Sequence, residues 1–418
     1  MSKQLEISDF INNKEIAPLI KKARELKDNP EFIVSDIVDD QKNQYVDLVQ
    51  EGGGVLGIAL LGYTCVLEES GIRFFDLAGT SAGSINTMLL ASLGNISIKK
   101  TEKILNYLKD QNLFDFVDGD KKIKALTQRL IDENYQGIIW KILYNVFRIK
   151  KYLTDNLGFN PGDAFENWMK KILNENRISS SADLTKLRKN LPNLKNTGNN
   201  PVKYEKARTA IITADVTTKS KVQFPQMAHL YWPDVNSIHP AKFVRASMSI
   251  PFFFEPFEAK NIPNSGLTNV SEWYESVRYK GEIPKNVKFV DGGLISNFPI
   301  NVFHVNDRVP YKPTFGVRLS AYRDKPADTS KFSGFLGGMI STMRQLHDLN
   351  FLLKHDDYSL LICNIDADKK YNWLDFNMKD EDKIGLFNLG AQKAMEFLDG
   401  FRWDEYKKLR KSLLKPKS

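Results

Sequence analysis

A serine lies between two glycines where an apolar run of this 418-residue sequence gives way to a helical pattern. The motif is G-T-S-A-G at 79–83, and the short run R-F-F-D-L at 73–77 before it is a predicted strand. A serine on a tight strand-to-helix turn needs small neighbours because the backbone bends sharply, and the turn lifts the hydroxyl clear of the sheet edge. We therefore predict Ser81 as a nucleophile, with Gly79 and Gly83 shaping the turn; the alternative is an ordinary glycine-rich turn.

Helical patterns, such as 56–69 and 82–92, separate several short apolar runs that are typical of strands. The expected strands lie at 45–49, 73–77, 210–213, 243–244, 287–290 and 314–319. Because strand and helix alternate along the chain, we expect an α/β fold, with helices layered on a mostly parallel central sheet.

The chain divides into three expected segments. Residues 1–44 are predicted to be an N-terminal helical segment, because their apolar residues fall on one helical stripe. Residues 45–405 form the expected main domain, interrupted at about 101–200 by a lysine-rich helical insertion. Residues 406–418 are expected to be a basic C-terminal tail.

A second glycine motif, G-G-G-V-L-G at 52–57, also follows a predicted strand and precedes a helix. Glycines in such a run let backbone N–H groups approach a phosphate or an oxyanion closely. A nucleotide site fits poorly, since the run lacks both G-K-[ST] and an acidic partner at the end of a second strand. Two interpretations stay open: an oxyanion hole built from Gly52, Gly53 and Gly54, or a tight turn without a ligand.

An aspartate ends another short apolar run, in the sequence F-V-D-G-G at 289–293. At a strand end, followed by glycines that allow close approach, Asp291 is placed to accept a proton from a hydroxyl group. Asp-Gly pairs are also common in turns, so an ordinary turn is the competing interpretation. All three motifs follow predicted strands, and open α/β sheets build their sites at the carboxyl ends of strands. A nucleophile, an oxyanion cradle and a base are the groups that acyl transfer requires.

Taken in this order, the motifs at 52–57, 79–83 and 291–293 resemble those of the patatin-like phospholipases, lipid acyl hydrolases that use a Ser-Asp dyad. The segments V-R-A-S-M-S-I-P at 244–251 and L-I-S-N-F-P at 294–299 are similar to the family's segments on either side of its acid. The resemblance spans about residues 45–320 and continues more weakly to Leu398. It implies a patatin-like three-layer α/β/α fold. One position departs from the family, which usually carries Arg or Lys where this chain has Leu56.

The resemblance implies that Ser81 attacks an ester carbonyl, that Asp291 accepts the Ser81 proton, and that backbone N–H groups of Gly53 and Gly54 hold the oxyanion. Water would then release the acyl group. The implied activity is that of a phospholipase A or lysophospholipase acting on membrane glycerophospholipids, with no metal and no organic cofactor. We expect Asp291 to be buried, because burial raises the proton affinity of a carboxylate.

Two other functions stay open at this point. His304, His347 and His355 follow Asp291 in the chain, which is the order of a Ser-Asp-His esterase of the α/β-hydrolase type. A catalytically silent membrane- or lipid-binding regulatory module is the second alternative.

The charge of the chain favours an anionic partner. Lys and Arg number 59 against 51 Asp and Glu, a net charge of +8. No zinc-finger spacing or RNP-type motif is present, so a phospholipid membrane surface is a better partner than nucleic acid. The basic amphipathic run at 137–153 fits a membrane surface or a core helix. Two cysteines are too few for a disulfide framework, and we expect a cytoplasmic protein, peripheral at a membrane, with an activator or regulatory partner.

Overall fold

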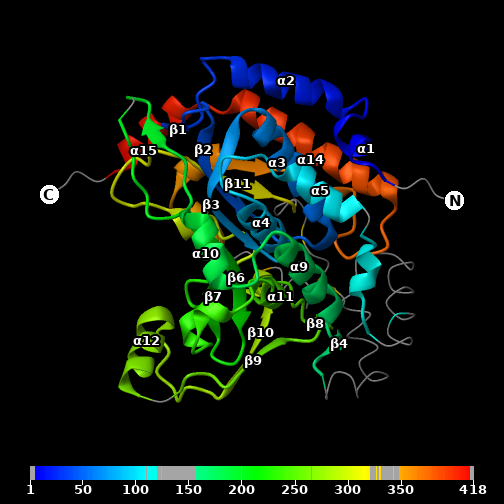
Figure 1. Ribbon diagram of the computed structural model, residues 1–418, viewed down its shortest axis with the longest axis vertical. Coiled ribbons are helices and arrows are strands. Elements are labelled where there is room, and N and C mark those ends of the chain that lie inside the picture. The colour runs from blue at the N-terminus through cyan, green and yellow to red at the C-terminus, as the bar shows by residue number, and fades with distance from the viewer. Residues whose placement is uncertain are drawn as a thin grey trace.

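The computed structural model describes residues 5–109, 111–119, 124, 156–198, 200–264, 266–320, 326, 329, 330, 342 and 348–414 (Figure 1). Its strands are β1 (Ile37–Asp39), β2 (Gln44–Gln50), β3 (Ile72–Thr80), β4 (Gly158–Asn160), β5 (Leu194–Asn196), β6 (Thr209–Asp215), β7 (Ser220–Phe224), β8 (Phe252–Phe254), β9 (Phe257–Lys260), β10 (Asn286–Asp291), β11 (Thr314–Arg318) and β12 (Ile362–Asn364). Its α-helices are α1 (Ile7–Ile11), α2 (Ile16–Asp28), α3 (Ile58–Glu69), α4 (Ala82–Ser92), α5 (Thr101–Lys109), α9 (Asp163–Glu175), α10 (Ser181–Lys189), α11 (Ala241–Ser247), α12 (Leu267–Val277), α14 (Asp380–Gly400) and α15 (Trp403–Leu413).

The central sheet is parallel in its middle and antiparallel at one side. Strands β12, β11, β2, β3 and β6 are neighbours in that order, and each adjacent pair is parallel. Beyond β6 the order continues to β10 and β9, which pair in the antiparallel sense. Short antiparallel strands β1 and β7 pair with β2 and β6. The α/β fold with a mostly parallel sheet that the sequence predicts is therefore confirmed.

Strands β3 and β10 meet end to end on the same side of β6. Strand β7 pairs with β6 from Ile211 to Asp215, so it occupies one side of β6 along that whole length. Strand β3 pairs with β6 only as far as Ile212, and β10 pairs with it from Thr213 onward. Because each strand has two hydrogen-bonding sides, β3 and β10 share the side opposite β7. Their carboxyl ends thus face each other at adjacent positions of β6.

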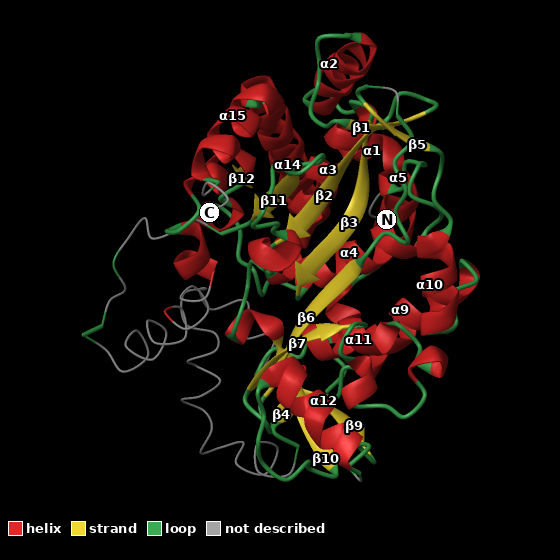
Figure 2. Ribbon diagram, turned by 90° about the vertical axis from the view of Figure 1, so that its left-hand side faces the viewer, coloured by secondary structure: helices red, strands yellow, loops and turns green. Residues whose placement is uncertain are grey.

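Helices cover the sheet on both sides. In Figure 2, α14 and α15 lie to one side of the central strands, and α9 and α10 lie to the other. Helices α3 and α14 approach closely because each has a glycine at the contact. A Cβ on Gly62 would overlap the carbonyl of Phe387, and one on Gly390 would overlap the carbonyl of Ala59. The apolar side chains of these helices and strands form one large core.

Several segments differ from the sequence-based expectations. The run at 243–244, predicted as a strand, lies in helix α11. Its two apolar residues are buried, and a helix can bury such a short run as well as a strand can. The predicted basic tail from 406 is largely helix α15, which extends to Leu413 and buries Tyr406 and Arg410. In the expected insertion, α5, α9 and α10 are helical, while β4 and β5 are short strands. The amphipathic run at 137–153 lies outside the described residues.

None of the helices in the described part of the chain is both long enough and apolar enough to cross a membrane.

Candidate active site

Ser81 stands on a strained turn between β3 and α4. Its backbone has φ 51° and ψ −120°, a conformation that non-glycine residues rarely adopt. The turn can form because its neighbours are small: a Cβ on Gly79 would overlap the carbonyl of Gly83, and one on Gly83 would overlap that of Gln50. Such strain persists where the surrounding structure fixes the residue, which is common at functional sites.

Ser247 in α11 fixes the Ser81 backbone. The Ser81 N–H donates a hydrogen bond to the Ser247 hydroxyl oxygen at 3.0 Å. That hydroxyl in turn donates to the carbonyl of Ile212 in β6 at 2.6 Å. The hydroxyl of Ser84 donates to the Ser81 carbonyl, also at 2.6 Å. The turn is therefore tied to α11, to β6 and to its own helix.

Asp291 ends β10 and is 7% exposed, which confirms the expectation that it is buried. Its Oδ1 atom accepts a hydrogen bond from the Gly293 N–H at 2.6 Å. Its backbone N–H donates to the carbonyl of Ser249 at 2.8 Å. The same short segment, from Ser247 to Ser249, thus anchors the backbones of both Ser81 and Asp291.

Ser81 and Asp291 line one pocket with a volume of about 260 Å³. Its other lining residues are Gly53, Gly54, Ile250, Pro251, Phe252, Gly293, Leu294 and Trp373. The polar groups are therefore gathered among mainly apolar walls, as in sites that bind small molecules. Phe252 belongs to this wall, whereas its neighbours Phe253 and Phe254 are buried in the core.

The glycine motif at 52–57 lies against the same pocket. Gly54 has φ 56°, and a Cβ there would overlap the carbonyl of Trp373, so only glycine fits without strain. That carbonyl accepts a hydrogen bond from the N–H of Val55 at 3.0 Å. The Trp373 backbone and side chain thus form one wall of the glycine loop and of the pocket.

The three glycines differ in what their N–H groups contact. The Gly52 N–H donates to the carbonyl of Asn297 at 3.0 Å, and Gly52 is not part of the pocket lining. Gly53 and Gly54 line the pocket, and their N–H groups make no hydrogen bond to any described residue. Of the three glycines predicted for the oxyanion hole, Gly53 and Gly54 therefore stay candidates as N–H donors, whereas the Gly52 N–H is already engaged.

Asn297 joins the loop after Asp291 to the glycine motif. Its side-chain amide donates to the carbonyl of Gly52 at 3.0 Å and to Glu51 at 3.2 Å. Glu51 is buried and also accepts the backbone N–H groups of Leu319 and Ser320 at 2.6 and 3.0 Å. A carboxylate held by several donors gives the loop a fixed position next to Ser81.

A second polar group ties the end of β3 to the same loop. The Thr80 hydroxyl donates to the carbonyl of Ser296 at 2.9 Å. The Ser296 hydroxyl donates to Asp348 at 2.8 Å and accepts from Lys221 at 3.0 Å. Burial lowers the pKa of Lys221, while Asp348 opposes that shift. The network holds the residue before Ser81 against the loop that follows Asp291.

Four residues of the site have no role predicted from the sequence: Ser247, Ser249, Asn297 and Trp373. Three of them lie in the segments 244–251 and 294–299, whose likeness to a family was the available signal. Trp373 lies in the weaker part of the resemblance, which extends to Leu398 and predicts no role for this residue. At the departing position, Leu56 is buried in the core, so its side chain offers no charge to the pocket.

His304 and His355 lie outside the pocket of Ser81. Nδ1 of His304 forms a hydrogen bond with the Tyr358 hydroxyl at 2.9 Å, and the His304 and His355 ring centroids are 4.4 Å apart. Burial lowers the pKa of His304 to about 4, with a further contribution from His355. Neither histidine lines the pocket of Ser81, and His347 lies outside the described residues. The geometry therefore offers no triad through His304 or His355.

Comparison with known proteins gives a family match and several similar chains. A family model described as patatin-like phospholipase matches residues 48–304, more than half of the chain, including Ser81 and Asp291. The uncharacterized protein YqhO of Bacillus subtilis (strain 168) is 29% identical over 356 residues, which is 85% of this chain and 98% of that protein.

Two solved structures are similar at lower identity. The crystal structure of VipD from Legionella pneumophila has a TM-score of 0.40 and 15% identity, covering 90% of this chain and 72% of that chain. ExoU, in its heterodimeric complex with SpcU from the type III secretion system of Pseudomonas aeruginosa, has a TM-score of 0.37 and 15% identity. That alignment covers 85% of this chain and 51% of the other.

Proposed function

Because the chain belongs to the patatin-like phospholipase family, we propose that it hydrolyses carboxyl esters of membrane glycerophospholipids or lysophospholipids through Ser81 and Asp291. The observation that supports the proposal is that two strand ends, those of β3 and β10, meet at adjacent positions on one side of β6. Ser81 follows one end and Asp291 forms the other, and both line the pocket that Gly53 and Gly54 also line.

In the proposed reaction, the Ser81 oxygen attacks the ester carbonyl carbon while Asp291 takes the hydroxyl proton. The carbonyl oxygen becomes negatively charged and is stabilised by the N–H groups of Gly53 and Gly54. When the tetrahedral intermediate collapses, the alcohol leaves with the proton from Asp291, and the acyl group stays on Ser81. Water then attacks the acyl-enzyme with Asp291 as the base, which releases the fatty acid and restores the serine.

The pocket wall supports an acyl chain as the bound group. Ile250, Phe252, Leu294 and Trp373 supply apolar surface beside the reacting groups. The net charge of +8 supports docking at an anionic membrane surface, where the protein would meet its substrate. We propose peripheral membrane association and a regulatory partner as part of this function.

Turnover of phospholipid vesicles and of a fluorogenic ester tests the proposal, with wild type, Ser81→Ala and Asp291→Asn compared. A fluorophosphonate probe followed by peptide mass spectrometry adds a direct test, because an activated serine is labelled covalently at its oxygen. Ser412→Ala is the matched control, since Ser412 is an exposed serine in α15, outside the pocket. We expect turnover and Ser81 labelling in wild type and in the control, and loss of both in Ser81→Ala.

A different result would favour the silent lipid-binding module. Wild-type protein that binds vesicles, yet neither hydrolyses lipid nor accepts the probe at Ser81, contradicts the enzymatic proposal. The assay includes a membrane extract as a source of activators, so that an inactive resting state is distinguished from an inactive site.

A further inference from the structure

A second pocket lies at the opposite end of the central strands from Ser81. It has a volume of about 320 Å³ and lies where β6 and β11 begin, whereas Ser81 follows the carboxyl end of β3. Among the described residues, the two pockets share none of their lining. Its size falls within the range of cavities that bind small organic molecules.

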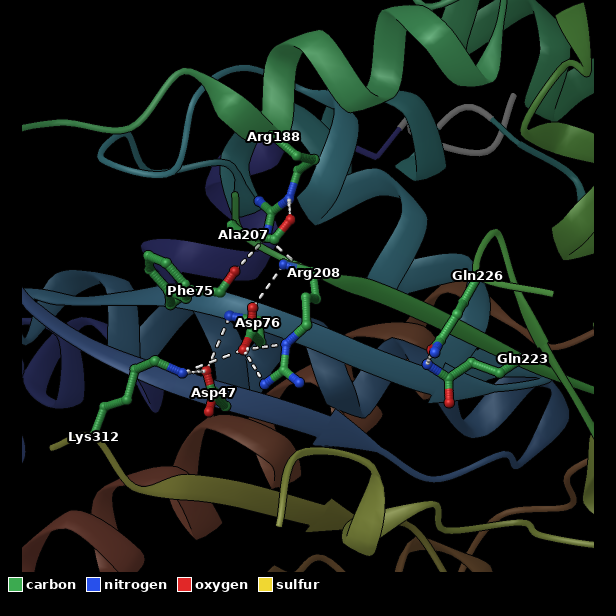
Figure 3. Close-up of polar contacts among 9 residues, drawn as sticks. All are labelled: Asp47, Phe75, Asp76, Arg188, Ala207, Arg208, Gln223, Gln226 and Lys312. Carbon is green, nitrogen blue, oxygen red and sulfur yellow. Dashed lines mark hydrogen bonds and ion pairs between the residues drawn. The ribbon is translucent and has the colours of Figure 1, made fainter. Parts of the chain in front are cut away.

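The floor of this second pocket is a buried ion cluster. Lys312 is 8% exposed, and its ammonium group contacts the carboxylates of Asp47 and, at 3.3 Å, Asp76 (Figure 3). Arg208 pairs with Asp76 at 2.6 Å from the other side. Both carboxylates are therefore already neutralised by cations of the chain itself.

The lining carries more positive than negative charge. It contains five cationic side chains, Lys206, Arg208, Arg308, Lys312 and Arg410, against two carboxylates, Asp47 and Asp76. Lys206 is exposed and makes no ion pair with a described residue. Arg308 is exposed as well, and its ion-pair partner is the adjacent Asp307 at 3.9 Å, a weak surface contact. Arg410 is buried and pairs with Asp357 at 3.7 Å, so the unbalanced positive charge lies on the exposed side chains of Lys206 and Arg308.

Aromatic rings stand among these cations. Six of the lining residues are aromatic: Phe75, Tyr204, Phe303, Tyr311, Tyr358 and Tyr406. The Arg208 guanidinium lies 4.7 Å from the centroid of Phe303, and the Lys312 ammonium lies 4.8 Å from that of Phe75. Tyr311 is 53% exposed, which leaves its ring available for stacking.

We propose that this pocket binds a small organic phosphate, in which the phosphate lies next to a flat ring. Lys206, Arg208 and Arg308 supply donors for the phosphate oxygens, because cationic side chains bind phosphate through charge-assisted hydrogen bonds. The exposed ring of Tyr311 and the half-buried ring of Tyr204, both in the pocket lining, supply surface for the flat part of the ligand. The proposal does not depend on the reaction at Ser81. The competing explanation is that the ion cluster only holds β2, β3 and β11 together.

Titration calorimetry of the full chain with phenyl phosphate tests the proposal in a buffer of low ionic strength, since screening weakens exposed charges. Two matched ligands serve as controls: inorganic phosphate carries the charge without the ring, and phenol carries the ring without the phosphate. Lys206→Gln/Arg308→Gln removes two mouth cations, and Tyr311→Ser removes one ring. Lys21→Gln/Arg278→Gln removes the same two charge types outside the pocket, and Ser81→Ala checks independence from the reaction.

We expect one phenyl phosphate per chain, bound at least about tenfold more weakly by Lys206→Gln/Arg308→Gln, as the loss of one charge-assisted hydrogen bond implies. Tyr311→Ser should also weaken binding, while the Lys21→Gln/Arg278→Gln and Ser81→Ala variants should bind like wild type. Lack of binding by wild type overturns the proposal, as does equal affinity for inorganic phosphate or phenol. Wild-type affinity in Lys206→Gln/Arg308→Gln overturns it too.

Discussion

The hydroxyl of Ser247 accepts a hydrogen bond from the backbone N–H of Ser81 at 3.0 Å. The same hydroxyl donates to the carbonyl of Ile212, which is the residue of β6 opposite Thr80. Ser247 is fully buried, so water does not replace these contacts when the hydroxyl is removed. A single side chain therefore holds the strained turn of the proposed nucleophile against β6, the strand that pairs with β3.

Ser247→Ala should lower kcat about tenfold with little change in KM, because Ser247 positions Ser81 without touching substrate. The unpaired Ser81 N–H and Ile212 carbonyl should also lower the free energy of unfolding by about 1–3 kcal/mol. Steady-state kinetics and urea unfolding measure the two effects. Ser92→Ala is the control, since Ser92 is a buried serine whose hydroxyl bonds, among the described residues, to Met88 and Leu89 of its own helix. A kcat that falls equally in both variants contradicts the positioning role.

Gly54→Ala should abolish most activity and destabilise the fold. Its φ of 56° costs a residue with a side chain about 1–2 kcal/mol, and the added Cβ would overlap the Trp373 carbonyl. Gly53→Ala is the matched comparison, since its Cβ would lie 2.7 Å from the end of the flexible Leu319 side chain. Activity assays and thermal unfolding of both variants check the prediction. Equal effects in the two variants would speak against a special role for the Gly54 backbone.

Ser81→Ala and Asp291→Asn should each reduce turnover about 10³-fold or more, because attack and proton transfer belong to one step. The double variant should be no slower than either single variant, because removing one member of a pair that acts as a unit already abolishes the effect of both. Phospholipid turnover at several enzyme concentrations measures these residual rates. Losses that multiply in the double variant are inconsistent with a dyad.

Protonation of His304 should destabilise the protein in mild acid. Its pKa is about 4 in the folded chain, chiefly because of burial, against 6.5 in the unfolded chain. Between these values the unfolded chain binds more protons, so stability falls as the pH drops from 6.5 toward 4. His304→Gln should reduce the loss of stability between pH 7 and pH 5 in urea unfolding. His229→Gln replaces an exposed histidine and should keep the wild-type dependence of stability on pH. If His304→Gln also keeps the wild-type dependence of stability on pH, the prediction is wrong.

The sequence predicted four of the five parallel strands, but not β12, and it predicted the residues at the ends of β3 and β10. Strands β2, β3, β6 and β11 each overlap a short apolar run bounded by turn residues, and such runs are local signals. The run at 243–244 failed because two buried apolar residues fit a helix as well as a strand. Helix α15 was missed because its charged residues outweigh the few that it buries.

The site itself was only partly predictable. Ser81, Asp291 and the glycines are marked by local turn chemistry, which a sequence shows directly. The engagement of Gly52 by Asn297 depends on two segments about 245 residues apart, and no local pattern encodes that contact. Ser247 is likewise an ordinary buried serine until the fold places it under Ser81.

The end-to-end arrangement of β3 and β10 makes strand alignment a requirement for catalysis in the proposed mechanism. Asp291 is placed by its pairing with Thr213, one residue beyond the pairing of Thr80 with Ile212. A slip of β10 by a single residue along β6 would carry the carboxylate about 3.3 Å away and turn its side chain to the opposite face of the sheet. Mutations far from the pocket that loosen this register would therefore abolish the proposed activity without replacing any of the reacting residues.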